Sequence, residues 1–399
     1  MAINLSNFLI SKKDRSKMGD FQDLDHLDGL SISVTSANLY NNNRDDLVLF
    51  YFRNGAEYAS VYTQSKVISE NIKWNLSIKN KKIKALIVNS RNANCLTGSK
   101  GYNSLKEIAD EAARLLSIKQ KCDEDNPKRI TSKDILFGCT GTIGEPFPVT
   151  KIKSSIKNLV DKIKYTQNKY LWIKSAMSIL TTDLKPKLSM EECKIGNTKV
   201  KIYGIAKGSG MIAPNMATML GFIATDATIP FNVLQALLTT TTDQSFNAIT
   251  VDSDTSTNDT VFLIATGCVN TPIIANSDDP NLADFQDALR RLMVDLATQI
   301  VRDGEGASKF ITITISGADS DHQARHIGLA IANSPLVKTA IAGQDANWGR
   351  IVMAIGKSNF GIDQQMISIK IGGLPVAANG MRVADYDETP IAAHMQTAS

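Results

Sequence analysis

The sequence has few of the residues that usually build metal, redox or disulfide sites. Its five cysteines stand far apart, at positions 95, 122, 139, 193 and 268. This spacing excludes a paired metal or redox motif, and the odd count argues against a disulfide scaffold. Of the four histidines, His322 and His326 are four residues apart, but the glutamate of a zinc-protease motif is missing, so we expect a surface pair on a helix and no metal site.

Long apolar runs and a charge imbalance are also missing. No window approaches the roughly 18 apolar residues of a membrane span, and the first twenty residues contain no run typical of a secretory signal. The 44 basic residues nearly balance the 40 acidic ones, which argues against nucleic acid or an anionic membrane as a partner. Because 43% of the residues are hydrophobic, the sequence predicts a globular, cytoplasmic protein with a large core.

Common catalytic motifs are missing too, since there is no G-x-S-x-G elbow, no P-loop and no G-x-G-x-x-G after a strand. Helix and strand patterns alternate instead, which predicts an α/β (α+β) fold. Strand patterns cover residues 45–52, 57–63, 82–90, the start of 134–148, 199–206, 259–266 and 309–315. Helix patterns cover residues 104–116, 151–172, 229–246 and 282–301. We also expect a turn at 53–56, a capping box of Ser104 with Glu107, and a domain junction near 200–218.

Several loops contain residues that suit ligand binding. The loop "CTGTIGEP" (139–146) is either an oxyanion-binding loop of backbone N–H groups or a tight turn between strands. In "AKGSGMIAPNMATML" (206–220), glycines let the backbone approach a ligand beside the charge of Lys207. The stretch "FNAITVDSDTSTNDTV" (246–261) is either a cation site or a network of capped turns. Glu305 follows a helix that we expect to end at Gly304, and it either receives an ammonium group or is a solvated carboxylate.

Thr218 follows a run of small and turn-forming residues. A threonine hydroxyl is a poor nucleophile unless a base lies beside it, and the α-amine of the same residue is such a base once it is a chain terminus. The pKa of an α-amine is about 7.7–8.0, so much of it is neutral near physiological pH. Such an amine requires cleavage of the Ala217–Thr218 peptide, whereas an uncut Thr218 is an ordinary core or turn hydroxyl.

Seven of these stretches together resemble the ornithine acetyltransferases, the bifunctional glutamate N-acetyltransferase/amino-acid acetyltransferases of arginine biosynthesis. They follow the order of that family, and each alone would be unspecific. The matching stretches are "VNSRNANCLTG" (88–98), "CTGTIGEPFP" (139–148), "TTDLKPK" (181–187), "AKGSGMIAPNMATML" (206–220), "FNAITVDSDTSTNDT" (246–260), "RDGEGASKF" (302–310) and "GQDANWGRI" (343–351).

The resemblance implies a two-part α/β sandwich and a precursor that cuts itself before Thr218. An α chain (1–217) and a β chain (218–399) would assemble as an α2β2 heterotetramer. Thr218 would take acetyl from N-acetylornithine and pass it to glutamate without a metal or cofactor, and acetyl-CoA is a second donor in some members. By matching position, Thr140 and Gly141 would form the oxyanion hole. Lys207, Glu305 and, from the Thr181-Thr182 pair, Thr182 would contact substrate.

Two departures from the family pattern lead to further expectations. Arg91 stands where the family usually has glycine, and we expect its side chain to crowd the loop. The sequence ends at Ser399, ahead of a terminal strand and segment that contact substrate in the family, so we expect those contacts to be absent. Two alternatives therefore remain open: an N-terminal-threonine amidohydrolase or aminopeptidase, and a truncated, inactive homologue.

Overall fold

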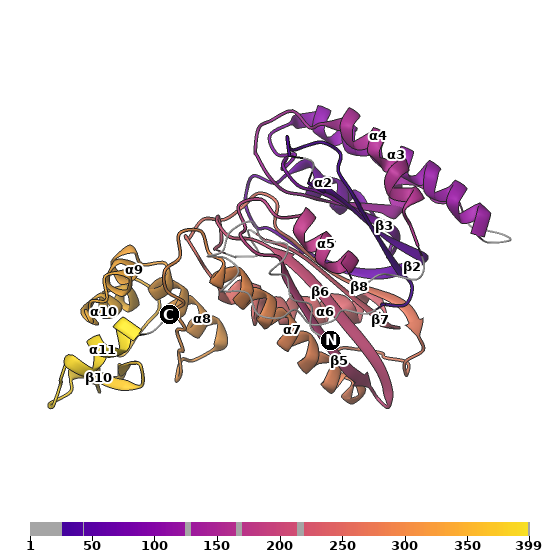
Figure 1. The fold of residues 1–399 in the computed structure, drawn as a ribbon. Coiled ribbons are helices and arrows are strands. Elements are labelled where there is room, and N and C mark those ends of the chain that lie inside the picture. Colours follow the sequence, from indigo (N-terminus) through magenta and orange to yellow (C-terminus); the bar gives the residue numbers. More distant parts are fainter. Residues whose placement is uncertain (1–25, 43, 124–128, 165–169, 214–218, 398–399) are drawn as a thin grey trace. The chain divides into compact units, whose positions relative to one another are not determined.

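The structure is a computed structural model that describes residues 26–42, 44–123, 129–164, 170–213 and 219–397 (Figure 1). The chain forms two compact units, the first from residues 1–247 and 254–305 and the second from residues 248–253 and 306–399. The expected junction near residues 200–218 was wrong, because strands on both sides of that segment pair in one sheet. In the described part of the chain, no helix is long and apolar enough to cross a membrane.

The first unit contains an eight-stranded mixed sheet in the order β4-β3-β2-β8-β7-β6-β5, with β1 paired to β2 beside this path. The pairs β3–β4 and β7–β8 are parallel and the others are antiparallel. The strands are β1 (Leu30–Thr35), β2 (Leu47–Tyr62), β3 (Lys82–Asn89), β4 (Ile135–Cys139), β5 (Lys187–Ile195), β6 (Thr198–Lys207), β7 (Leu220–Ala227) and β8 (Thr260–Val269).

The turn expected at residues 53–56 was wrong, because β2 runs through it as one strand of 16 residues. Gly55 has a φ of +77°, and the register with β3 shifts between Tyr51 and Ala56. The positive φ and the register shift mark a bulge, and a bulge bends the strand that contains it. The long strand pairs with β1 over its first half and with β8 over its second half, which joins the two halves of the sheet.

Helices cover both faces of this sheet, which confirms the α/β expectation. On β6, the Tyr203 ring lies 5.7 Å from the Trp172 ring of α5, whereas a Cβ atom on Gly204 would lie 2.9 Å from Leu296 of α7. Because successive strand residues face opposite sides, α5 and α7 lie on opposite faces. The helices of this unit are α2 (Glu70–Ser77), α3 (Gly98–Asp123), α4 (Val149–Asp161), α5 (Tyr170–Ser178), α6 (Phe231–Asp243) and α7 (Ala283–Arg302).

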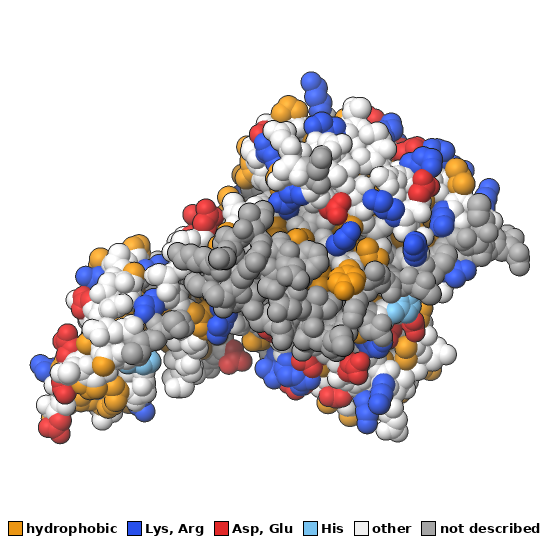
Figure 2. All heavy atoms as spheres, in the orientation of Figure 1, with side chains coloured by type: hydrophobic (Ala, Val, Ile, Leu, Met, Phe, Trp, Pro, Cys, Tyr) orange, Lys and Arg blue, Asp and Glu red, His pale blue; other side chains and the backbone are white. Residues whose placement is uncertain are grey.

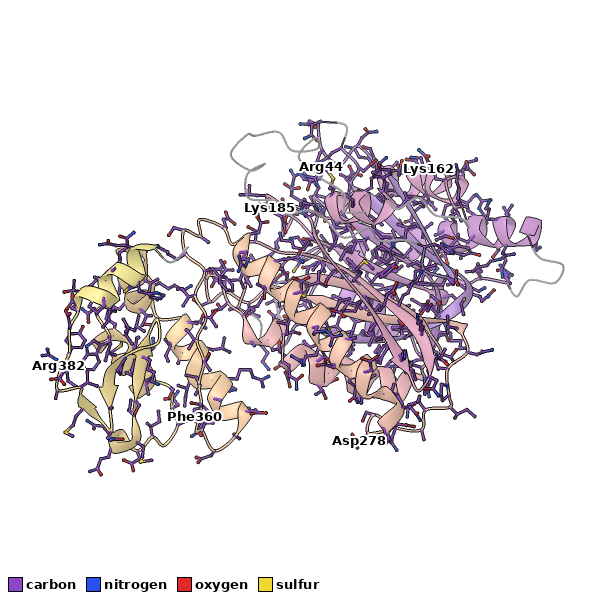
Figure 3. The ribbon with its side chains drawn as sticks, turned by 60° about the horizontal axis from the view of Figure 1, so that its bottom comes forward. Arg44, Lys162, Lys185, Asp278, Phe360 and Arg382 are labelled. Carbon is purple, nitrogen blue, oxygen red and sulfur yellow. The ribbon has the colours of Figure 1, made fainter. Side chains whose placement is uncertain are left out.

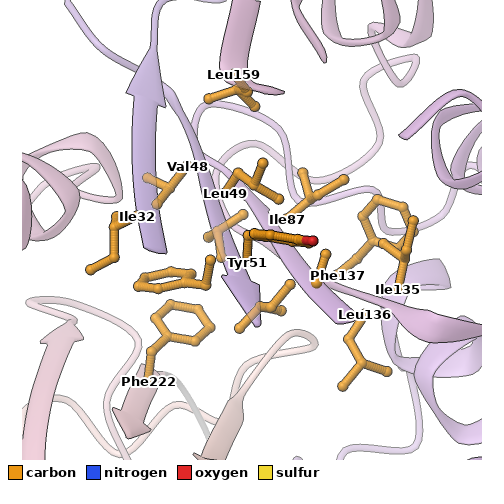
Figure 4. Packing of buried hydrophobic residues seen from close by; sticks show 14 of the residues in the cluster. Ile32, Val48, Leu49, Tyr51, Ile87, Ile135, Leu136, Phe137, Leu159 and Phe222 are labelled. Carbon is orange, nitrogen blue, oxygen red and sulfur yellow. The ribbon is translucent and has the colours of Figure 1, made fainter. Parts of the chain in front are cut away.

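A buried hydrophobic cluster holds the sheet and its helices together (Figure 4). Phe222 on β7 packs against Phe50 on β2 at 5.7 Å between ring centroids and stacks on Phe262 of β8 at 6.3 Å. Fully burying one such side chain contributes about 1.5–3 kcal/mol. The polar ends of the strands are therefore held on a rigid scaffold.

Three further helix and strand expectations need correction. Helix α3 begins at Gly98 rather than near Ser104, whose hydroxyl donates to the carbonyl of Lys100, so the expected capping box is not formed. The pattern at 151–172 is divided between α4 and α5. Residues 309–315 alternate as expected, and Ile313 and Ile315 pack on a core cluster. Residues 309–315 nevertheless pair with no strand among the described residues, so the strand expected there was wrong.

The second unit is smaller and contains a three-stranded antiparallel sheet in the order β11-β10-β9. His322 and His326 lie exposed on α8 with ring centroids 4.1 Å apart, as the spacing predicts. Both rings contact the ring of Phe360. The elements are α8 (Asp321–Ala332), α9 (Pro335–Ala342), α10 (Gly349–Gly356), β9 (Ile369–Ile371), β10 (Leu374–Ala378), β11 (Met381–Arg382) and α11 (Thr389–Thr397). Figure 2 shows basic and acidic side chains interspersed on the face it displays, in line with the balanced composition.

Candidate active site

One end of the large sheet collects most of the predicted site residues. Lys207, the last residue of β6, pairs with Leu220 at the start of β7, and Leu220 pairs with Thr260 at the start of β8. Ala217 and Thr218 precede Leu220 in the sequence but lie outside the described residues. Their roles in cleavage and nucleophilic attack therefore stay predictions.

Lys207 belongs to a buried cluster of two lysines and two aspartates. Lys187 at the start of β5 is 1% exposed, and its Nζ lies 2.6 Å from Asp183 Oδ1 and 2.6 Å from Asp303 Oδ2. Lys207 Nζ lies 3.6 Å from Asp183 Oδ2. Opposite charges therefore compensate each other inside the protein, as buried charges require.

Backbone donors complete the cluster. Asp183 accepts a hydrogen bond from the N–H of Gly208 at 2.6 Å, and Asp303 accepts from the N–H groups of Leu184 and Lys185. Burial by itself raises the pKa of Asp183, but Lys207, Lys187 and the Gly208 N–H outweigh it and hold that pKa well below its usual range. Asp183 is therefore ionised and ties the segment that carries Lys207 to the loop before β5.

The Thr181-Thr182 pair lies on that same loop. Thr181 accepts a hydrogen bond from Lys207 Nζ at 2.8 Å, and its N–H donates to Asp183. The Thr182 side chain is exposed instead. The loop is anchored further by Arg44, whose side chain is labelled in Figure 3. Arg44 donates to the carbonyls of Met177 and Leu180. Thr181 thus fixes Lys207, and a substrate contact of Thr182 stays a prediction.

The glycine loop after β4 has a backbone that only glycine fits. Gly141 has a φ of +133°, and a Cβ atom there would lie 2.0 Å from the carbonyl carbon of Arg91 and 2.4 Å from the nitrogen of Asn92. The N–H of Thr140 donates to the carbonyl of Asn89. Two loops, 89–95 and 139–145, are thereby held in direct backbone contact, which favours a shaped binding loop over a simple turn.

Arg91 does not crowd this loop, contrary to expectation. It adopts a φ of +76°, the left-handed conformation that glycine supplies most easily. Its guanidinium donates to the Thr142 hydroxyl at 2.6 Å and forms an ion pair with Glu145 at 3.2 Å. The side chain therefore extends along residues 142–145 and pairs there, while the backbone keeps a glycine-like turn.

Asn258 connects the glycine loop to the sheet. It is 6% exposed and lies within the segment 246–261, which we interpreted only as a cation site or a network of capped turns. Its amide donates to the carbonyl of Cys139 at 2.9 Å, to that of Ala93 at 2.6 Å, and to Asn71 Oδ1 at 3.3 Å. The described residues contain no group of three or more potential metal ligands. The segment 256–259 is a buried hydrogen-bonded network that positions Thr140.

Glu305 lies beside the segment that leads away from Lys207. Its N–H donates to the carbonyl of Ser209 at 2.9 Å, and the Ser209 hydroxyl donates to the carbonyl of Asp303 at 2.7 Å. A Cβ atom on Gly210 would lie 2.3 Å from Glu305 Oε2. The carboxylate therefore lies directly over a glycine, and its side chain is exposed. A cation and an anion thus flank one short backbone segment, 207–210.

Sequence reasoning missed four residues that hold these groups in place, namely Asp183, Lys187, Asn258 and Asp303. All four lie within the motifs quoted above. The signal available was a charged or amide side chain within each of these motifs. Only the folded chain shows that these positions, far apart in sequence, are buried together.

Comparison with known proteins agrees with the motifs. The ArgJ family pattern matches residues 31–399. The "Arginine biosynthesis bifunctional protein ArgJ" of Gluconobacter oxydans is 44% identical over 375 residues, covering 94% of this chain and 85% of the relative. The protein of the same name from Zymomonas mobilis is 42% identical over 375 residues, covering 94% and 88%. The solved ArgJ structure from Bacillus halodurans matches with 28% identity and a TM-score of 0.42, covering 47% of this chain and 91% of that one.

Proposed function

Because the chain belongs to the ArgJ family, we propose that it is a bifunctional enzyme of arginine biosynthesis that transfers acetyl from N2-acetyl-L-ornithine to L-glutamate in the cytoplasm. The observation that carries this proposal is the placement of Lys207 and Glu305 at the two ends of one short segment. Amino-acid substrates carry a carboxylate and an ammonium group, and these two side chains are complementary to them. Thr182 is the further substrate contact.

The proposed nucleophile is Thr218, released by self-cleavage of the Ala217–Thr218 peptide. The hydroxyl attacks the preceding carbonyl, and water opens the resulting ester. The new α-amine then acts as the base for the hydroxyl of its own residue. Cleavage divides the precursor into an α chain (1–217) and a β chain (218–399), and two of each form the α2β2 heterotetramer.

Acetyl transfer follows in two steps. Thr218 attacks the acetyl carbonyl of N-acetylornithine, ornithine leaves, and the amine of glutamate then takes acetyl from the threonine ester. The hydroxyl of Thr140 and the N–H of Gly141 stabilise the oxyanion in both steps. Thr140 contributes its hydroxyl because its N–H already donates to Asn89. Each step exchanges an acyl group, so the proposed cycle needs no redox cofactor, and acetyl-CoA enters only as a second acetyl donor.

Lys207 keeps donors for a substrate carboxylate. An ammonium group has three N–H donors, and Thr181 accepts one of them. Asp183 lies 3.6 Å away, which is an ion-pair distance but beyond hydrogen-bond length. Lys187 provides the closer compensation for Asp183. Lys207 is therefore oriented by the cluster and remains able to bind an anionic group.

Intact mass and product analysis test the proposal together. The purified protein should give two chains, the second beginning at Thr218, and should form N-acetylglutamate from N-acetylornithine only when glutamate is present. Thr218→Ala should stay a single chain and lose activity, whereas Thr218→Ser keeps a hydroxyl and should still be cut. Deacetylation that ignores glutamate would favour the amidohydrolase alternative, and an uncut, inactive wild-type chain would identify an inactive homologue.

A further inference from the structure

Both carboxylate oxygens of Asp183 face donors from separate parts of the chain. Oδ1 accepts from Lys187 Nζ at 2.6 Å and from the N–H of Gly208 at 2.6 Å. Oδ2 accepts from the N–H of Thr181 at 3.1 Å and lies 3.6 Å from Lys207 Nζ. The side chain is 0% exposed. A buried carboxylate bound at both oxygens cannot rotate without breaking several of these contacts, so Asp183 is a fixed point of the site.

Lys207 depends on Asp183 for a compensating charge. The Lys207 side chain is 11% exposed, and a buried ammonium group is costly unless an opposite charge lies beside it. Among the residues that the structure describes, Asp183 is the one acidic residue that forms an ion pair with Lys207. Asp303 pairs with Lys187 instead. Without Asp183, burial would favour the uncharged amine of Lys207, which attracts a carboxylate only weakly.

Asp183, Thr181 and Lys207 form a closed triangle of contacts. Lys207 Nζ donates to the Thr181 hydroxyl at 2.8 Å, and the Thr181 N–H donates to Asp183 Oδ2. The same oxygen faces Lys207 Nζ. These contacts fix two directions at the ammonium nitrogen and leave at least one of its three N–H groups for a ligand. A flexible lysine is thereby held in one orientation before a ligand binds, and such pre-organisation reduces the entropy lost on binding.

We propose that Asp183 is a positioning residue for substrate binding, which keeps the Lys207 ammonium group charged and directed toward the carboxylate of an amino-acid substrate. Asp183 acts through Lys207 and does not itself touch the substrate. Its own negative charge repels a carboxylate, but Lys187 and the Gly208 N–H, both at 2.6 Å, offset that charge. The benefit of a charged and oriented Lys207 therefore outweighs the repulsion. This inference rests on the carboxylate-binding role proposed above for Lys207.

The test measures ligand binding to the full-length protein, so it does not depend on turnover. Calorimetry gives the Kd of L-ornithine and of L-ornithinamide, in which an uncharged amide replaces the carboxylate. A hydrogen bond to a charged group corresponds to roughly tenfold to hundredfold in affinity, so the wild type should bind ornithine at least about tenfold more tightly than ornithinamide. In Asp183→Asn, the Kd of ornithine should rise about tenfold, and that of ornithinamide should stay within about twofold.

Asp226→Asn is the matched control, because it also removes a buried carboxylate from the large sheet. Asp226 is 4% exposed and accepts the N–H of Lys201 at 2.9 Å. It lies next to the Ile202↔Thr225 pair, at the far end of the β6–β7 ladder from Lys207. D226N should keep the wild-type difference between the two ligands. Melting temperatures identify the range in which each variant is folded.

A second comparison avoids a variant with an unpaired buried cation. Asp183→Asn combined with Lys207→Met removes opposite charges together, and Lys187 keeps Asp303 as its partner. This double variant should bind ornithine as Lys207→Met alone does, because Asp183 acts through Lys207. Weaker ornithine binding by the double variant than by K207M would overturn the proposal.

Turnover provides the third readout. Because the contact stabilises the ground state and the transition state alike, D183N should raise the KM for N-acetylornithine about tenfold and change kcat little. A wild-type ratio of the two Kd values in D183N, tighter ornithine binding, or an equal loss for both ligands would each overturn the role of Asp183. A wild type that binds both ligands alike would also remove Lys207 from carboxylate binding. A wild type that distinguishes the two ligands but transfers no acetyl group would contradict the proposed function alone.

Discussion

Replacing Lys187 by methionine removes the central cation of the buried cluster while nearly preserving side-chain length. Lys187 Nζ lies 2.6 Å from carboxylate oxygens of both Asp183 and Asp303, and all three side chains are at most 3% exposed. Breaking a buried ion pair by removing one partner costs about 3–5 kcal/mol. Lys207 compensates part of the charge on Asp183 from 3.6 Å. We therefore expect the free energy of unfolding to fall by about 3–4 kcal/mol.

Urea and thermal unfolding of the purified protein measure this loss. The expected change lowers the melting temperature by roughly 10 °C in a domain of this size. Lys157→Met is the matched control, because Lys157 pairs with Asp161 on α4 while both side chains are exposed, at 71% and 59%. An exposed pair of this spacing contributes about 0.3–0.5 kcal/mol. A K187M chain that unfolds within 1 kcal/mol of the wild type would refute the reasoning.

The same variant has a predictable pH dependence. The pKa of Asp183 is depressed in the folded protein, so its ionisation contributes stability above the unfolded value of about 3.9. That contribution is lost as pH falls toward the folded pKa. The difference in unfolding free energy between K187M and wild type should be largest near pH 7 and should shrink below about pH 4. If this difference in unfolding free energy stayed constant across the pH range, the loss of stability in K187M would not depend on the charge of Asp183.

Four further substitutions, one of them a control, probe the loops. Gly141→Ala should lower the rate of acetyl transfer by at least 10²-fold, because its Cβ would meet the Arg91 carbonyl. The control Gly144→Ala also has a positive φ but open space around it, so it should lower the free energy of unfolding by only about 1 kcal/mol and keep activity. Equal effects of the two variants on acetyl transfer would contradict this account. Gly210→Ala should displace the Glu305 carboxylate and raise the KM for glutamate about tenfold with little change in melting temperature, and an unchanged KM would remove Glu305 from substrate binding. Asn258→Ala should lower the free energy of unfolding by about 1–3 kcal/mol, and it should also lower kcat. Unfolding and initial-rate measurements check the two effects, and a loss of stability alone would limit Asn258 to a structural role.

Local patterns predicted the elements whose burial alternates or repeats regularly. Helix α7 and strands β3, β6 and β8 appear close to the expected ranges, because their apolar periods match their packing. The patterns failed where a long-range contact decided the conformation. The polar stretch "RNGA" predicts a turn that separates two strands. Instead β2 bends there at a bulge and continues as one strand, which pairs with β3 on both sides of the bulge and with β8 beyond it.

The candidate site shows the same division. Residue types and order were enough to select Thr140, Gly141, Lys207 and Glu305 as site residues by family resemblance. No local pattern shows that Lys187 would lie between two aspartates with only 1% of its surface exposed. That environment is formed by strands and loops more than a hundred residues apart, so it can be derived only from the folded chain.

The ladder between β6 and β7 runs from Ile202↔Thr225 to Lys207↔Leu220 and ends next to the predicted scissile bond. A nick there would sever covalent continuity but leave this ladder, and the further pairing of β7 with β8, in place. The two fragments should consequently co-purify until a denaturant is added. Genes encoding residues 1–217 and 218–399 separately should reconstitute the enzyme by fragment complementation, each fragment supplying a strand that the other lacks.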